Sequence, residues 1–67
     1  MSYKVSYNNG DVYRVEKHNT FEDARKSVLD IVDGINYTIE EDNGNEILLL
    51  SHYCGAISWF EATITQD

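Results

Sequence analysis

The residue types best suited to chemistry in this chain are a histidine and a cysteine that lie two positions apart, His52 and Cys54. They point the same way only if the segment between them is extended, and a nucleophilic thiol also needs a third group to orient its base. A zinc site needs about four ligands, and the other imidazole in the chain belongs to His18. No spacing in the sequence completes either set. We therefore expect no enzymatic activity, no catalytic or metal-binding residues and no cofactor.

A cluster of carboxylates is the second candidate. These six side chains, which lie at the end of a predicted helix and around a predicted turn, are Asp30, Asp33, Glu40, Glu41, Asp42 and Glu46. Carboxylates on a rigid frame could occupy a basic cleft that normally replaces the counterions of nucleic acid. The alternatives are a solvated face that favours solubility or a calcium loop, although the spacing does not match a helix-flanked calcium site. We take the six as candidate partner-binding residues.

The charges are distributed unevenly along the chain. All five Lys and Arg residues lie at or before Lys26, where four Asp or Glu residues accompany them. After Lys26 the chain carries eight Asp or Glu residues and no basic side chain, so that its formal net charge is -7. Such a field repels nucleic acid and membranes and attracts basic proteins. We therefore expect a basic protein or a nucleic-acid-binding protein complex as the partner, and no direct binding to nucleic acid or membrane.

Length and composition favour a single domain over residues 1–67. Of the 67 residues, 42% are hydrophobic, and no apolar run is long enough for a transmembrane helix. The first residues lack the apolar stretch of a signal peptide, and a single cysteine excludes an internal disulfide. These features predict a cytoplasmic protein. A chain this short leaves little room for a pocket beside its core, and we therefore favour binding over catalysis.

Two alternating segments near the start predict a hairpin around an Asn-Asn-Gly turn. The predicted strands cover residues 2–8 and 11–17. A two-residue loop would place Val5 opposite Arg14, whereas a three-residue loop places Val5 opposite Tyr13 and keeps the apolar faces together. We predict the three-residue loop, with Gly10 in the left-handed conformation.

The single predicted helix covers residues 20–33. Thr20 is a favourable N-cap, and acidic residues in the first turn suit the helix dipole. Apolar side chains recur at three- and four-residue spacing and form one stripe. These side chains are Phe21, Ala24, Val28, Leu29, Ile31 and Val32. Gly34 suits the left-handed residue after the last turn, and Asp30 and Asp33 then fall at the end of the helix, where carboxylates are electrostatically unfavourable.

The second half of the chain predicts three more strands. They cover residues 35–40, 47–50 and 56–65. An Asp-Asn-Gly-Asn turn joins the first two, and its loop length places either Glu41 or Glu40 opposite Glu46, so that like charges face each other in both cases. The run Ile47–Leu50 is wholly apolar, which is typical of a central strand buried on both sides. The order β-β-α-β-β-β predicts a two-layer α+β fold, with one helix packed on a mostly antiparallel sheet.

A single helix covers one face of a sheet, and we expect the other face to expose aromatic side chains. Several tyrosines, together with Trp59, are predicted there. Exposed aromatic residues are typical of protein interfaces. The alternative function is therefore a structural or oligomeric module, such as a homodimer, that associates through this face and uses its acidic residues for solubility.

The chain resembles small phage-encoded inhibitors of bacterial defence systems, especially anti-CRISPR proteins. The resemblance depends on the turn Asn8–Gly10, the helix from Thr20 to Asp33 and the acidic hairpin from Glu40 to Glu46. It covers the whole chain as a profile of size, acidity and architecture and includes no shared motif, so it assigns no functional residue. It implies a non-enzymatic inhibitor with an acidic, nucleic-acid-mimicking surface, which blocks a basic cleft or a nuclease assembly in the host cytoplasm.

Overall fold

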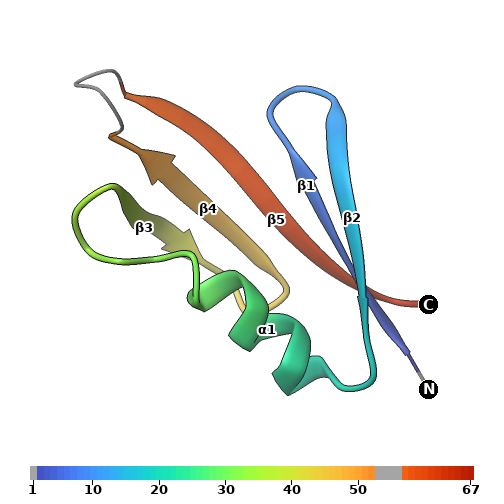
Figure 1. Cartoon of the computed structure of the whole chain (residues 1–67). Coiled ribbons are helices and arrows are strands. Elements are labelled where there is room, and N and C mark those ends of the chain that lie inside the picture. The colour runs from blue at the N-terminus through green and yellow to red at the C-terminus, as the bar shows by residue number, and fades with distance from the viewer. Residues whose placement is uncertain (1, 53–56) are drawn as a thin grey trace.

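A five-stranded antiparallel sheet carries one helix on one of its faces (Figure 1). The structure, a computed structural model, describes residues 2–52 and 57–67. Its strands are β1 (Tyr3–Asn8), β2 (Val12–His18), β3 (Tyr37–Asp42), β4 (Glu46–Ser51) and β5 (Ser58–Gln66), and its helix is α1 (Phe21–Leu29). The predicted two-layer α+β class and the order of elements along the chain are confirmed.

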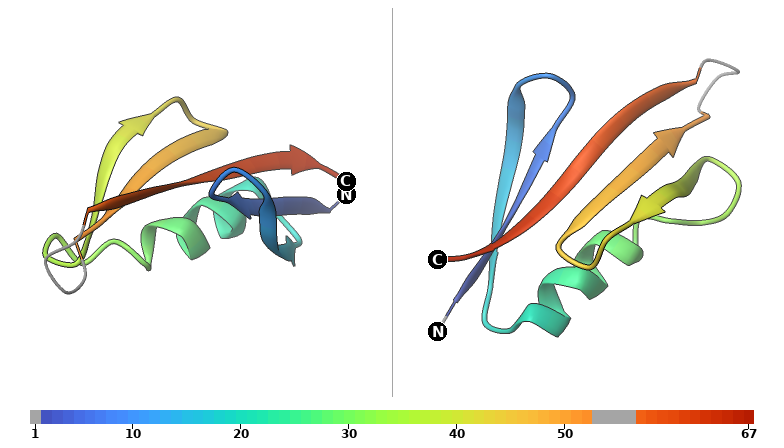
Figure 2. Two further views of the ribbon diagram at one scale, coloured as in Figure 1. Left: turned by 90° about the horizontal axis from the view of Figure 1, so that it is seen from above. Right: turned by 180° about the vertical axis from the view of Figure 1, so that it is seen from behind.

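The strands lie in the order β2-β1-β5-β4-β3, so that the last strand of the chain is central in the sheet. β5 pairs with β1 on one side and with β4 on the other, and it thereby joins the two hairpins that α1 separates in sequence. Figure 2 shows that α1 runs along one side of the sheet and leaves the opposite side uncovered. We call these the helix side and the open side.

The core lies between α1 and the sheet. Its nine buried residues are Val5, Tyr7, Ala24, Val28, Ile47, Leu49, Phe60, Ala62 and Ile64. Those in β1, β4 and β5 occupy alternate positions, as expected for strands with one covered face. The rings of Tyr7 and Tyr37 lie near that of Phe60, at centroid distances of 6.5 and 6.1 Å. Burial of this apolar layer is the main favourable term in the folding of so small a domain.

The helix is shorter than predicted and ends at Leu29 rather than at residue 33. Its start is as expected, because the Thr20 hydroxyl accepts a hydrogen bond from the backbone N–H three residues later (3.0 Å). At the other end, the N–H groups of Ile31 and Val32 donate to carbonyls three residues back, which tightens the chain into a turn. Gly34, with a φ of 79°, follows in the connection to β3.

The first hairpin has the predicted three-residue loop but not the predicted pairing. Residues 9–11 form the loop, and Gly10 has a φ of 95°. This loop lies one residue later than the Asn8–Gly10 loop that would pair Val5 with Tyr13, and a β-bulge at the start of β2 shifts the register by one more residue, so that Val5 lies opposite Glu16. One extra residue moves every later side chain to the other face of a strand. Polar side chains of β2 therefore face the helix side.

The second hairpin avoids the predicted repulsion between glutamates. The Asn43 N–H donates to the carbonyl of Glu46 (2.8 Å), so that Glu46 faces Asn43 across the turn. In the same register Glu41 lies opposite Leu48, and a β-bulge at Glu40 shifts only the pairing of the residues that precede it in β3. Both pairings predicted from the sequence, of Glu46 with Glu40 and with Glu41, are wrong.

Two strands of the second half differ from the prediction. β3 begins at Tyr37 rather than at residue 35, and Ile35 is exposed in the connection. The buried residues of β4 are Ile47 and Leu49, and its two half-buried leucines are Leu48 and Leu50. The predicted burial of β4 on both sides is therefore only half right, because α1 covers one face. The predicted start of β5 at residue 56 lies outside the described residues.

Candidate protein-binding surface

Asp33 stabilises the connection between α1 and β3. Its Oδ1 accepts hydrogen bonds from the backbone N–H groups of Ile35 (2.8 Å), Asn36 (2.7 Å) and Tyr37 (3.0 Å). These bonds, that of Tyr37 first, lower the pKa of Asp33 because they stabilise its charged form. The carboxylate is thus used within the chain, which makes Asp33 a poor candidate for contact with a partner.

Asp42 faces the helix side and pairs with Arg25. Nη1 of Arg25 donates to Oδ1 (3.0 Å) and Nη2 donates to Oδ2 (2.8 Å), which makes the pair bidentate. The same Nη1 donates to the Gly44 carbonyl (2.7 Å), and the Gly44 N–H donates to Asp42 Oδ1 (2.9 Å). The bonds from Arg25, followed by that from Gly44, lower the pKa of Asp42 to about 2. A basic residue from the first half of the chain therefore neutralises one of the six candidate carboxylates.

We expect acid to weaken the fold as Asp42 becomes protonated. The pKa of Asp42 lies below its ordinary value of 3.8, so its pair with Arg25 adds stability above pH 3.8 and loses it as the pH falls to about 2. The urea midpoint should fall over this range. Asp42→Asn should reduce the fall most, and Arg25→Gln should reduce it somewhat less because the Gly44 N–H still bonds to Asp42 in that variant. A remainder should persist in both because the pKa values of Asp33 and Glu16 are also lowered. An undiminished fall in both variants would contradict this assignment.

The other four candidate carboxylates are exposed, but they do not form one surface. Asp30 is the C-cap residue of α1 and lines a groove between α1 and β2. Glu40 occupies the bulge in β3. Glu41 and Glu46 lie on the open side, since their partners in β4 and β5 alternate with core residues. The structure therefore brings two of the six together on one face of the sheet.

A third carboxylate joins these two on the open side. Leu48 lies opposite Glu41 on one neighbouring strand and opposite Glu61 on the other. Glu46 is two residues before Leu48 in β4, so the three carboxylates surround one half-buried leucine at Cα separations of roughly 5–10 Å. Glu61 was not among the six carboxylates predicted from the sequence. Its alternation with Phe60 predicts its side of β5, but only the strand order places it near Glu41.

Next to these carboxylates the open side exposes apolar side chains. Leu50 pairs with Trp59, whose side chain is 46% exposed. Both alternate with core residues of their strands, as Leu48 does, so all three lie on the same side of the sheet. We define the open face as Glu41, Glu46, Leu48, Leu50, Trp59 and Glu61.

Three of the tyrosines, Tyr3, Tyr7 and Tyr37, lie on the helix side rather than on the open side, and Tyr53 and the side chain of Tyr13 lie outside the described part of the chain. Tyr7 is buried, and Tyr3 and Tyr37 pack against the core. The ring of Tyr3 lies 5.9 Å from that of Phe21 in α1. The alternation of β1 explains the positions of Tyr3 and Tyr7, because the odd-numbered residues of β1 face the helix. Among the described side chains, Trp59 is therefore the aromatic residue that the open face presents.

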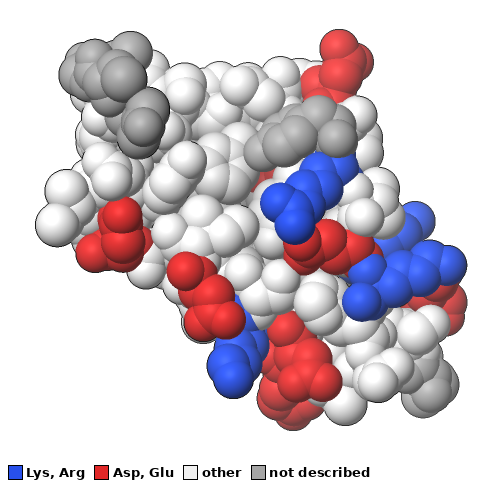
Figure 3. Space-filling view, viewed as in Figure 1, with Lys and Arg blue, Asp and Glu red and all other residues white. Residues whose placement is uncertain are grey.

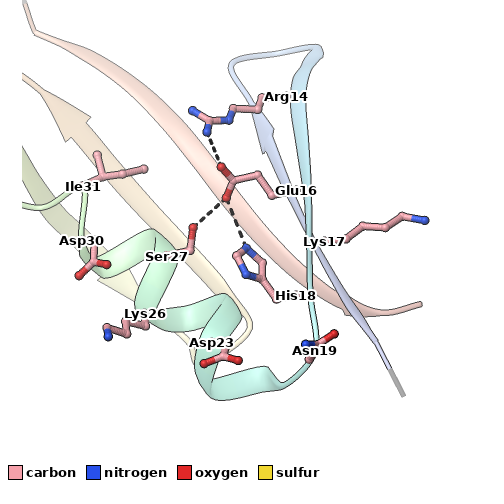
Figure 4. A pocket seen from close by; sticks show the side chains of 10 residues that line it. All are labelled: Arg14, Glu16, Lys17, His18, Asn19, Asp23, Lys26, Ser27, Asp30 and Ile31. Atoms are coloured by element: carbon pink, nitrogen blue, oxygen red, sulfur yellow. Dashed lines mark hydrogen bonds and ion pairs between the residues drawn. The ribbon is translucent and has the colours of Figure 1, made fainter.

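The helix side carries charges of both signs (Figure 3). Acidic and basic side chains together line a groove of about 560 Å³ between β2 and α1 (Figure 4). Within it Glu16 pairs with Arg14. Its Oε1 accepts a hydrogen bond from Ser27 Oγ (2.8 Å) and lies 3.5 Å from His18 Nε2. The Ser27 hydroxyl is the largest cause of the lowered pKa of Glu16, and the neighbouring imidazole and guanidinium act in the same direction. This network ties β2 to α1 and offers no uniform charge to a partner.

A contact between His52 and Cys54, the two residues considered for catalysis, lies outside the described part of the chain. Cys54 lies outside the described residues. His52 Nε2 lies 3.0 Å from the Thr38 hydroxyl, and the His52 N–H donates to the carbonyl of Asn36 (2.7 Å). These contacts tie the end of β4 to the start of β3. Over residues 2–52 and 57–67, no group of three metal-binding side chains is arranged to hold an ion.

The chain matches no protein-family model, no curated protein and no solved structure. In the described part of the chain, no helix has the length and apolar character needed to cross a membrane.

Proposed function

We propose that this chain is a non-enzymatic inhibitor that binds a basic protein through its open face. The supporting observation is that three carboxylates surround Leu48 beside the exposed Trp59, while no Lys or Arg belongs to β3, β4 or β5. A basic surface that otherwise binds nucleic acid has the complementary charge. A bacterial defence nuclease complex in the cytoplasm is the partner class that the resemblance to anti-CRISPR inhibitors suggests.

The open face combines two components of a stable protein interface. Trp59 and Leu50 provide an apolar contact whose burial contributes affinity, and tryptophan is prominent among the residues that dominate binding energy. Glu41, Glu46 and Glu61 provide carboxylates beside it. Charges at the rim of an interface mainly raise the rate of association and its dependence on salt. Binding should therefore be fast at low salt and should retain an apolar contribution at high salt.

The spacing of the carboxylates limits how closely the open face imitates nucleic acid. Duplex DNA carries one charge per ~1.7 Å of helix axis. Glu41 and Glu61 lie two strands apart, which separates their Cα atoms by roughly 10 Å. Charge alone would then hold the partner less tightly than DNA does. We accordingly assign part of the affinity to Trp59 and Leu50. Competition with DNA would then arise because the bound chain sterically occupies the DNA-binding site of the partner.

Self-association through the open face is the alternative, and its own residues oppose it. A twofold dimer would bring Glu41, Glu46 and Glu61 of one copy toward the same residues of the other. Like charges at a desolvated interface are costly unless basic groups offset them. β3, β4 and β5 carry no such groups. A basic partner therefore fits this face better than a second copy does.

Neutralising the open face should weaken partner binding more than neutralising other exposed acids. The test variant is Glu41→Gln/Glu46→Gln/Glu61→Gln, and the control with the same change in net charge is Asp11→Asn/Glu22→Gln/Asp30→Asn. The partner is first isolated from bacterial lysate at low salt and then purified for calorimetry. The test variant should bind about tenfold or more weakly, whereas the control should bind as the wild type does. Equal losses in both variants would show that net charge alone matters and would contradict the proposal.

A competition assay tests the inhibitory step itself. Duplex DNA added to the complex should release the chain, because both occupy the same basic surface. Trp59→Ala should weaken binding at high salt as well as at low salt, since its contribution is apolar. A partner that binds DNA and this chain simultaneously would exclude inhibition by occupancy.

A further inference from the structure

β2 is an edge strand, and part of its backbone points away from the sheet. The Asp67 N–H donates to the carbonyl of Ser2 (2.9 Å), so the even-numbered residues of β1 bond toward β5. The odd-numbered residues of β1 therefore bond toward β2, where they face even-numbered partners. The N–H and C=O groups of Val15 and Lys17 consequently point outward from the free edge of the sheet.

We propose that β2 pairs in antiparallel fashion with β2 of a second copy, about a twofold axis at Val15. In this register the two Val15 residues exchange two backbone hydrogen bonds. Arg14 lies opposite the second copy's Glu16, and Glu16 lies opposite the second copy's Arg14. These are non-hydrogen-bonded positions, where the Cα atoms approach to about 4.5 Å and the side chains are closest. The strand is thus complementary to itself in charge.

Other symmetric registers place like charges opposite each other. An axis at Arg14, Glu16 or Lys17 sets that residue against its own copy, and like charges directly opposite are destabilising. In the remaining registers, a residue whose N–H and C=O groups point outward would lie opposite one whose groups bond to β1. Such registers cannot form the ladder of hydrogen bonds. Between Arg14 and Lys17, the axis at Val15 is therefore the one that matches both the hydrogen bonds and the charges.

The other edge strand, β3, lacks these properties. A bulge at Glu40 interrupts its edge, and the run Glu40–Asp42 gives it charges of one sign. Two copies of β3 would repel each other, which protects that edge from pairing. β2 pairs with β1 in a continuous register from Arg14 to His18, and Val15 is 49% exposed to solvent. It also lies in the half of the chain that contains all the basic residues, where two copies of an acidic protein can approach most closely.

The paired strands would join the two sheets into one. Because the twofold axis runs perpendicular to the sheet, both open faces would lie on the same side of the dimer. A dimer of this kind presents two acidic faces to one large surface and increases avidity for it. The inference itself uses only the β2 edge and does not depend on the proposed function.

Charge exchange across the interface tests this pairing. Arg14→Glu and Glu16→Arg each turn both attractive pairs of the homodimer into repulsive ones. Each variant alone should raise the dimer dissociation constant about tenfold or more, measured by sedimentation equilibrium at low salt. An equimolar mixture of the two should dimerise again, because the acidic strand of one variant faces the basic strand of the other. Recovery in the mixture is a result that simple damage to the fold would not give.

A charge variant at Glu16 could fail to fold, because Glu16 also accepts a hydrogen bond from Ser27 within the chain. Two further measurements test the pairing of β2 without such a variant. Val15→Pro removes an outward N–H and leaves the bonds to β1 intact, so it should yield a monomer. In the wild type, the amide protons of Val15 and Lys17 should exchange more slowly as protein concentration rises. A wild type that stays monomeric at millimolar concentration overturns the proposal, as do charge variants that dimerise as tightly as the wild type.

Discussion

Replacing Leu49 with alanine should remove much of the stability of this domain. Leu49 is 0% exposed in the middle of β4, opposite Phe60 of β5 on one side and Ile39 of β3 on the other. Truncation of a buried leucine costs about 2–5 kcal/mol, through lost burial and the cavity left behind. A domain of this size has a free energy of unfolding of roughly 3–10 kcal/mol. The variant should therefore unfold at a much lower urea concentration and contain a measurable unfolded fraction without urea.

The matched control is Leu48→Ala, which makes the same change one residue earlier. Leu48 is half-buried on the open side, and we expect a loss of about 1 kcal/mol or less. Urea unfolding followed by circular dichroism gives both free energies of unfolding. Equal losses in the two variants would mean that the open side is as well covered as the helix side, which would contradict the open face as an exposed surface.

Replacing Val28 with aspartate should separate the helix from the sheet. Val28 is 0% exposed and belongs to the cluster that joins α1 to the sheet. A carboxylate there would be buried without a basic partner, or would be neutralised by protonation, and either outcome costs several kcal/mol. Because α1 is the only helix that covers the described core, the whole domain should unfold with it. The amide signals in a proton–nitrogen NMR spectrum should lose their dispersion at neutral pH.

Leu29→Asp is the control for that substitution. Leu29 is the next residue in α1 and is 36% exposed, although the sequence assigned it to the apolar stripe. Its replacement adds a small unfavourable interaction with the C-terminal end of the helix dipole, and the spectrum should stay dispersed. Adjacent helix residues point about 100° apart. A folded Val28→Asp with an unfolded Leu29→Asp would therefore place the other face of α1 against the sheet.

Local sequence patterns predicted the elements of the fold well. Thr20 begins the helix as a cap, and the left-handed glycine Gly10 lies in a hairpin loop of the predicted length. Each of these features depends on residues only a few positions apart, so it can be read along the chain. The predicted end of the helix at residue 33 was wrong because Asp33 bonds to the backbone of the following segment. The position of Asp33 in the sequence does not reveal this role.

The candidate surface was predicted in part. Glu41 and Glu46 lie together on the open face, while Asp42 reaches Arg25 on the helix side. The hairpin alternation separates Glu41 from Asp42, and the position of the turn sets the pairing of both, whereas the bulge at Glu40 sets the pairing of the residues before it. Glu61 belongs to the open face because β5 lies between the two hairpins in the sheet. Contacts between segments this distant in sequence follow from packing of the whole core.

The sequence by itself determined the segregation of charge, the alternation of the strands, the cap of the helix and therefore the α+β class. Only the tertiary structure decided the two bulges, the central place of β5 and the neutralisation of Asp42 by Arg25. A bulge changes which face every later residue of a strand occupies. Its position is set by the free energy of packing both hairpins against one helix, which depends on residues far apart in the chain and on no single local pattern.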